Sequence, residues 1–181
     1  VDRPEHQRRD PLALDPWRDG AVLVLGGAAS GRTNALAVLA VVARAHHDAE
    51  VRWVAGDAAE LWQALTLPAA RRVLVLADDL DATLAHGDAE QRADLAELVA
   101  LLAREGGRRG LAIAASARTA GGALSQATAS FEQRILLRMP TREDHLLAGG
   151  EARGHRADRR PGSCLWRAHE AQLALAPRGD Q

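Results

Sequence analysis

Residues 26 to 33 carry the pattern in this chain best suited to holding an anion. They read Gly-Gly-Ala-Ala-Ser-Gly-Arg-Thr, which follows the phosphate-binding P-loop pattern G-x-x-x-x-G-K-[ST] except that arginine stands in place of lysine. Glycines allow a tight loop whose backbone N–H groups point at phosphate oxygens, and the threonine would offer its hydroxyl to Mg²⁺ at a helix N-terminus. The pattern predicts a nucleotide site made by Gly26, Ala29, Ser30, Gly31, Arg32, Thr33 and Asn34.

The arginine at position 32 has two readings. The lysine of this pattern normally touches the β- and γ-phosphates, so its replacement could indicate a loss of catalysis. However, all 23 basic residues of the chain are arginines. A general drift from lysine to arginine would produce the same replacement, and Arg32 alone does not separate the two readings.

A second motif is acidic and follows a strongly apolar run. Residues 73 to 77 read Val-Leu-Val-Leu-Ala and are followed by Asp78 and Asp79. In P-loop ATPases such a strand ends in an acidic residue that holds Mg²⁺, and the next residue orients the attacking water. Asp78 is therefore predicted to bind Mg²⁺ with Thr33, and Asp79 is the candidate base, although its side chain is one methylene shorter than the usual Glu. Alternatively, Asp78, Asp79 and Asp81 only cap and solvate the start of a helix.

The elements that must position these residues alternate along the chain. A short apolar run at 21–25 predicts a buried strand, and the Ala- and Leu-rich segment 34–44 predicts a helix after the glycine loop. Further strands are predicted at 51–54, 73–77, 111–115 and 135–137, and helices at 57–65, 88–104 and 141–147, with a short helix or turn at 125–131. This alternation indicates an α/β fold with a mainly parallel sheet covered on both faces.

The domain organisation is simple. The 181 residues suffice for one domain with a proper core. We expect an extended lead-in over 1–19, a single P-loop domain over 20–176 and a short tail over 177–181. Three prolines break up the lead-in, which would pack through Leu12, Leu14 and Trp17. The first residues do not resemble a native start, so we expect the chain to be part of a longer protein.

Composition excludes several classes of function. The net charge of −1 gives no basic field, so DNA binding by this domain alone is not expected. Cys164 is the only cysteine, which excludes an internal disulfide, and with no secretory signal it favours a reducing, cytoplasmic compartment. The apolar stretch 20–43 is interrupted by glycines and Arg32, so no membrane contact by the domain is expected. Its histidines lack the spacing of a zinc site with Cys164.

With these pieces aligned, the chain resembles the FtsK/SpoIIIE family of P-loop ATPases over nearly its whole length. Residues 26–33 look like the Walker A loop of that family, and residues 74–80 look like its Walker B strand. Residues 110–119 are similar to its strand ending in Ala-Thr-Gln-Arg-Pro, and residues 134–138 with Asp144 to its late arginine–strand–Asp segment. Residues 161–166 take the place of its Pro-Gly-x-Gly hairpin. The resemblance implies a RecA-like fold with a C-terminal β-hairpin.

Within the family, the chain is most similar to the tandem ATPase modules of the EccC/EssC proteins of type VII secretion, especially a C-terminal module of an actinobacterial member. That similarity implies a cytoplasmic domain of a membrane-anchored protein. Its partners would be neighbouring ATPase modules of the same chain and small helical-hairpin secretion substrates with a Trp-x-Gly motif. ATP and Mg²⁺ are the implied ligands.

Three departures from the family pattern point toward a degenerate module. The lysine is Arg32, the catalytic Glu is Asp79, and the Gln that would sense the γ-phosphate is Ala117. Arginine keeps the charge but not the point-like contact of an ammonium group. We therefore expect slow or absent ATP hydrolysis, weak or absent nucleotide binding, and a regulatory, scaffolding or client-binding role.

Two alternatives remain at this stage. The chain could be an active ring-forming motor of the DNA-translocase type, for which Arg118, Arg134 or Arg138 would have to reach a neighbouring subunit as an arginine finger. It could also be an unrelated P-loop enzyme, although a standard GTPase needs the motif Asn-Lys-x-Asp, which a chain without lysine cannot contain.

Overall fold

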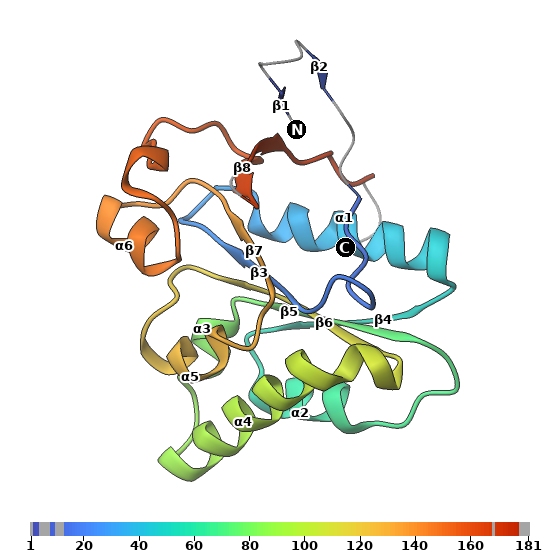
Figure 1. Cartoon of the computed structure of the whole chain (residues 1–181). Coiled ribbons are helices and arrows are strands. Elements are labelled where there is room, and N and C mark those ends of the chain that lie inside the picture. The colour runs from blue at the N-terminus through green and yellow to red at the C-terminus, as the bar shows by residue number, and fades with distance from the viewer. Residues whose placement is uncertain (1, 4–7, 10–12, 168, 178–181) are drawn as a thin grey trace.

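The computed structural model describes residues 2–3, 8–9, 13–167 and 169–177. Its centre is a seven-stranded sheet in the order β4-β5-β6-β3-β7-β8-β9 (Figure 1). The strands are β3 (Val22–Leu25), β4 (Glu50–Ala55), β5 (Val73–Asp78), β6 (Leu111–Ala117), β7 (Gln133–Leu136), β8 (Ser163–Trp166) and β9 (His169–Gln172). Neighbours among the first five in the sheet are parallel, whereas β8 and β9 add to one edge as an antiparallel hairpin.

Helices cover both faces of this sheet, as predicted. The long helix α1 (Arg32–His47) lies on one face, and four helices lie on the other: α2 (Ala58–Thr66), α3 (Leu80–Thr83), α4 (Ala89–Glu105) and α5 (Ser125–Thr128) (Figure 1). Helix α6 (Arg142–Leu147) lies beside the β7 end. The described chain also contains the short 3-10 helices η2 (Gly106–Arg109), η3 (Gly122–Leu124) and η4 (Ala152–Gly154). Near the N-terminus, β1 (Asp2–Arg3) pairs with β2 (Arg8–Arg9). Among the described residues, no helix is both long and apolar enough to cross a membrane.

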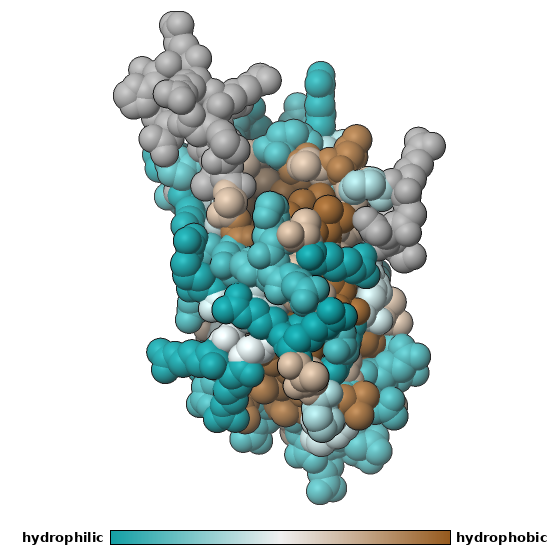
Figure 2. Space-filling view, turned by 90° about the vertical axis from the view of Figure 1, so that its right-hand side faces the viewer, coloured by the Kyte–Doolittle hydropathy of each residue, from teal (hydrophilic) through white to brown (hydrophobic). Residues whose placement is uncertain are grey.

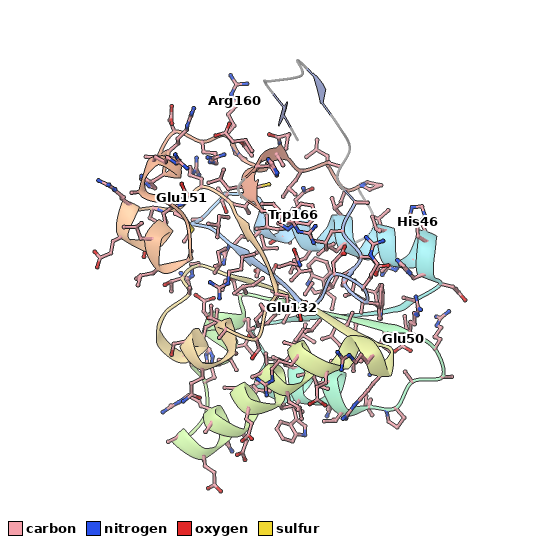
Figure 3. The ribbon with its side chains drawn as sticks, viewed as in Figure 1. His46, Glu50, Glu132, Glu151, Arg160 and Trp166 are labelled. Carbon is pink, nitrogen blue, oxygen red and sulfur yellow. The ribbon has the colours of Figure 1, made fainter. Side chains whose placement is uncertain are left out.

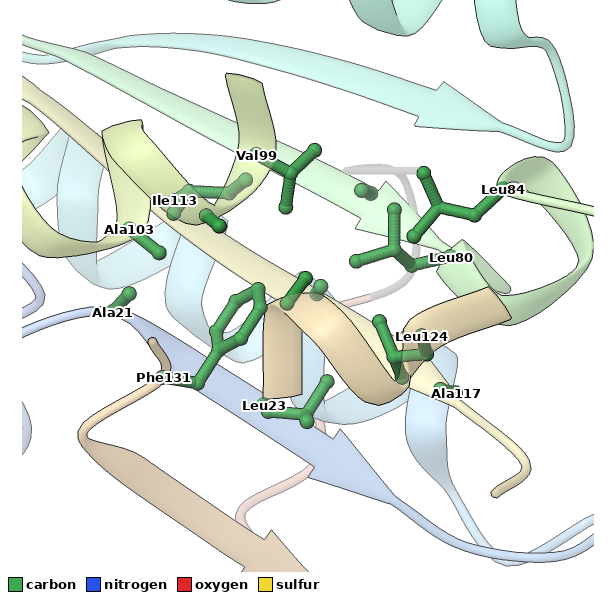
Figure 4. Close-up of a cluster of buried hydrophobic side chains, with 14 of the residues drawn as sticks. Ala21, Leu23, Leu80, Leu84, Val99, Ala103, Ile113, Ala117, Leu124 and Phe131 are labelled. Atoms are coloured by element: carbon green, nitrogen blue, oxygen red, sulfur yellow. The ribbon is translucent and has the colours of Figure 1, made fainter. Parts of the chain in front are cut away.

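Two apolar clusters hold the layers together, because successive side chains of a strand point to opposite faces. In β3, Leu23 and Leu25 pack toward α2–α5, whereas Val22 and Val24 pack toward α1. Phe131 fills the space between α4 and the sheet, near Leu23 (Figure 4). The face in Figure 2 is mostly hydrophilic across its middle, so polar side chains cover the core there. The central strand that carries the P-loop is thus anchored from both sides.

The helix starts follow local capping chemistry. Asp57 accepts a hydrogen bond from Glu60 N at the start of α2, and Asp88 forms a capping box with Gln91 at the start of α4. Thr141 accepts from Asp144 N at the start of α6. These are the helix starts that the sequence predicts, within one residue.

Some elements differ from the prediction. Residues 80–83 form the short helix α3, so a helix does start after Asp79, but no side chain caps it. Leu80 and Leu84 bury their side chains on the sheet, and Asp79 O accepts from the N–H of Thr83. Helix α1 runs three residues beyond the predicted end at Arg44. Trp17 of the lead-in packs against the α1-side core, as expected, together with Leu14. Leu12 and the last four residues of the tail lie outside the described residues.

Candidate functional site

The P-loop lies between β3 and α1 and is fixed by its neighbours in the sheet. Gly26 N donates to Ala117 O at the end of β6 (3.1 Å), and Gly27 N donates to Arg138 O beyond β7 (2.8 Å). Ala29 (φ 54°) and Gly31 (φ 104°) adopt left-handed backbone, with right-handed or extended residues around them. Such alternation turns successive N–H groups toward one side of the loop and forms a nest for an anion.

The N–H groups of this nest have no acceptor elsewhere in the described residues. No hydrogen bond is donated to any described residue by the backbone N–H of Ala28, Ala29, Gly31, Arg32 or Thr33. The last two begin α1, so the helix dipole adds a partial positive charge at the same place. Backbone donors without partners at a helix N-terminus fit a phosphate group.

The two predicted magnesium ligands are brought together. Thr33 Oγ1 donates to Asp78 Oδ2 over 2.8 Å, although β6 lies between the strand of the P-loop and the strand of Asp78. A hydroxyl and a carboxylate oxygen are the ligand types that Mg²⁺ prefers, so this donor set fits the ion.

Ser116 completes this arrangement, although it is not among the site residues predicted from the sequence. Its hydroxyl, fully buried on β6, donates to Asp78 Oδ1 and accepts from Asp79 N over 3.0 Å. It thereby fixes both the carboxylate that faces Thr33 and the backbone of the candidate base. The available signal was its place at the carboxyl end of a strand predicted to lie in the same sheet.

Arg32 and Asp79 form an ion pair with 2.6 Å between Nη1 and Oδ1. The Arg32 side chain is 13% exposed and that of Asp79 is 46% exposed. Asp79 itself is left-handed (φ 53°), which aims its carboxylate back toward the P-loop rather than along α3. The cation in the lysine position and the candidate base therefore neutralise each other.

The remaining predicted residues have structural contacts of their own. Asn34 Nδ2 donates to Ala174 O (2.8 Å), and Asn34 Oδ1 accepts from Ala176 N (3.0 Å), so this side chain holds the C-terminal segment. Ser30 O accepts from Gly162 N in the turn before β8 (2.9 Å). The C-terminal hairpin thus braces one side of the loop.

The three candidate arginine fingers lie in different places. Arg138 Nη2 donates to Ala28 O of the P-loop over 3.1 Å, within the same chain. Arg118 donates its backbone N–H to Asp81 Oδ2, and Arg134 donates from Nη2 to Thr128 O. Arg138 is the member of this set that contacts the phosphate loop directly. Ala117, at the position of the sensor, is fully buried and has no polar side-chain atom to offer.

A separate groove of about 510 Å³ lies between β7, β8 and the segment from α6 to η4. Leu136, Leu165 and Trp166 supply apolar surface, and the groove is also lined by glycines and by charged residues, among them Glu132, Glu151 and Arg134. Figure 3 labels Glu132, Glu151 and Trp166, which line this groove.

The described residues hold no cluster of three metal-ligating side chains. Burial raises the pKa of Cys164 to about 11.

Comparison with known proteins identifies the fold. No family sequence model and no curated protein sequence matches the chain. Among solved structures, it is similar to EssC (ATPases 2 and 3) from Geobacillus thermodenitrificans, with a TM-score of 0.71 and 16% identity over 99% of this chain and 44% of that one. It is also similar to EccC (ATPases 2 and 3) of Thermomonospora curvata in complex with a signal sequence peptide, with a TM-score of 0.61 and 15% identity over 93% and 39%.

A third similar structure is the pCW3 conjugation coupling protein TcpA with ATPγS, with a TM-score of 0.59 and 14% identity over 90% of this chain and 61% of that one. The chain covers less than two thirds of the length of each of these structures. It therefore has the P-loop ATPase fold of single EssC and EccC ATPase domains.

Proposed function

We propose that this chain is a degenerate ATPase module of a type VII secretion protein of the EccC/EssC kind, within the FtsK/SpoIIIE family. In this proposal it keeps a phosphate cradle that binds nucleotide weakly, hydrolyses ATP slowly or not at all, and regulates or scaffolds neighbouring ATPase modules of the same chain. The observation that carries the proposal is the 2.6 Å ion pair between Arg32 and Asp79.

That ion pair removes two catalytic parts together. A general base must be able to accept a hydrogen bond from the attacking water, and the carboxylate of Asp79 is already held by a guanidinium. The guanidinium of Arg32, in turn, is not free to stabilise charge that develops on a transferred phosphoryl group. Ala117 cannot replace either function, because its side chain has no donor or acceptor.

The nucleotide and its ion would be held by what remains. The free N–H groups of the P-loop would bind phosphate oxygens, and Thr33 and Asp78 would hold Mg²⁺. When bound, Mg²⁺ supplies positive charge to the phosphates. Thr33, Asp78 and Ser116 already form one hydrogen-bonded group, which keeps these oxygens in place before any ligand enters.

The likeness to EssC and EccC domains supports the finer parts of the proposal. The chain would be a cytoplasmic part of a membrane-anchored secretion protein, and its clients would be small helical-hairpin proteins with a Trp-x-Gly motif. A similar EccC structure contains a signal sequence peptide. In this proposal the groove beside β7 and β8 is the surface that would receive such a segment.

Hydrolysis by the purified chain tests the proposal. We expect no phosphate release above that of a Thr33→Ala control when MgATP is added. A clear Mg²⁺-dependent rate that is lost in both Thr33→Ala and Asp78→Ala would contradict it. Addition of double-stranded DNA separates the alternative, because an active DNA translocase would hydrolyse ATP faster with DNA, whereas a degenerate module would not respond.

A further inference from the structure

Arg32 occupies the P-loop position whose side chain normally contacts the third phosphate of a nucleotide. In this chain Arg32 is already paired with Asp79. The two side chains meet at 2.6 Å, and Arg32 is largely shielded from solvent by its surroundings. The Asp79 side chain is nearly half exposed, but its Oδ1 beside the guanidinium is buried. A protein anion thus occupies the place of a ligand anion.

We propose that this site does not read the γ-phosphate, so that it binds a nucleoside diphosphate at least as tightly as a triphosphate. The inference rests on the nucleotide cradle of the proposed function and adds the class of ligand to it. Asp79 is the residue that sets this specificity, because it competes with the third phosphate for Arg32.

The free hydrogen-bond donors of the loop belong to its backbone rather than to Arg32. The backbone N–H groups of residues 28, 29, 31, 32 and 33 have no partner in the described part of the chain, so a phosphate held by them displaces only water. A phosphate that binds Arg32 must first displace the carboxylate of Asp79 from its ion pair, which leaves that carboxylate without a cation. Such an exchange of one anion for another yields little net attraction.

The negative charge of the site also disfavours a third phosphate. Asp78 and Asp79 both lie at this end of β5, and Asp78 already accepts hydrogen bonds from Thr33 and Ser116. Displaced from Arg32, Asp79 would remain close to a triphosphate and repel it. Arg138 contributes a guanidinium near the loop, but that group donates to Ala28 O. Like charges brought together in a partly buried site lower affinity.

Isothermal titration of the full chain with MgADP and with MgATP tests this inference. The informative variant is Asp79→Asn, because asparagine adopts left-handed backbone readily and keeps the shape of the side chain while removing its charge. The matched control is Asp81→Asn, which removes the same charge two residues away, where the carboxylate accepts from Arg118 N and not from Arg32. Thermal unfolding without nucleotide verifies that each variant is folded.

We expect the wild-type dissociation constant for MgADP to be equal to or below that for MgATP. In Asp79→Asn the affinity for MgATP should rise about tenfold, since a charge-assisted contact becomes available to the γ-phosphate, while the affinity for MgADP changes much less. Asp81→Asn should keep the wild-type ratio.

Three results would overturn the inference, and they differ in what else they affect. A wild-type preference for MgATP of tenfold or more would refute it while leaving a nucleotide-binding module intact. An equal gain in MgATP affinity in Asp79→Asn and Asp81→Asn would assign the effect to net charge rather than to the ion pair. Absence of binding in the wild type and in Asp79→Asn would refute the nucleotide cradle itself, and the inference with it.

Discussion

Removing the hydroxyl of Ser116 should destabilise the fold and release one oxygen of Asp78, one of the two predicted magnesium ligands. This hydroxyl donates to Asp78 Oδ1 and accepts from Asp79 N, and the residue is fully buried. In Ser116→Ala both partners lose their contact inside the sheet. The side chain of Asp78 and the N–H of Asp79 would then have to find water or remain unpaired.

The magnitude follows from the two contacts. A hydrogen bond to a charged group contributes about 1.5–3 kcal/mol to the free energy of unfolding, and a neutral one about 1 kcal/mol. Because the site is partly open to solvent, water can replace some of this, so we expect a loss of about 2 kcal/mol. For a domain of this size that corresponds to a decrease in Tm of roughly 4–8 °C.

Urea unfolding followed by circular dichroism measures this loss, with the m-value as a check that the transition itself is unchanged. Ser116→Thr keeps the hydroxyl and should retain most of the stability. Ser125→Ala, at an exposed position on α5, is the control for removal of a serine hydroxyl and should change the free energy by less than about 0.5 kcal/mol. A Ser116→Ala protein as stable as this control would refute the assigned role of Ser116.

Three further results are expected. Burial lowers the pKa of His145 below its ordinary value, and nearby His155 adds to this, so folding favours the neutral ring. The free energy of unfolding should therefore have its full value above about pH 6.5 and fall as the pH drops below it. Urea titrations of His145→Gln should show a smaller fall in the free energy of unfolding over the same pH range. Burial raises the pKa of Cys164 to about 11, so iodoacetamide at pH 8 should label it slowly in the folded chain and quickly in urea, as mass spectrometry can follow. Trp17→Ala should cost about 3 kcal/mol in urea unfolding, because the ring packs on the α1-side core and Nε1 donates to Gly110 O.

Much of the fold can be predicted from the sequence because its local signals agree with one another. The apolar runs that form β3 and β5 are continuous, as buried parallel strands require, and the caps at Asp57, Asp88 and Thr141 mark helix starts. The glycine loop between β3 and α1 could be assigned for the same reason. Helix α3 could be named only as an alternative, because four residues are too few for a periodic pattern and its burial depends on the sheet beneath it.

The candidate site could be predicted only in part. The contact between Thr33 and Asp78 could be predicted from their residue types and from their places at the ends of strands in one parallel sheet. The pairing of Arg32 with Asp79 could not be predicted, because it depends on a left-handed backbone at an aspartate. The role of Ser116 depends on β6 lying between the other two strands, and the contacts of Asn34 depend on the return of the chain from β9.

A single-turnover experiment tests most directly the claim that this site can hold nucleotide without hydrolysing it. The full chain, in excess over radiolabelled ATP with Mg²⁺, is quenched at increasing times, and the nucleotide is separated by chromatography. We predict that the wild-type protein converts labelled ATP to ADP no faster than the protein-free control does. Conversion to ADP in the wild type, abolished by Thr33→Ala, would show an active site and contradict the assignment of Arg32 and Asp79 to a mutually neutralised pair.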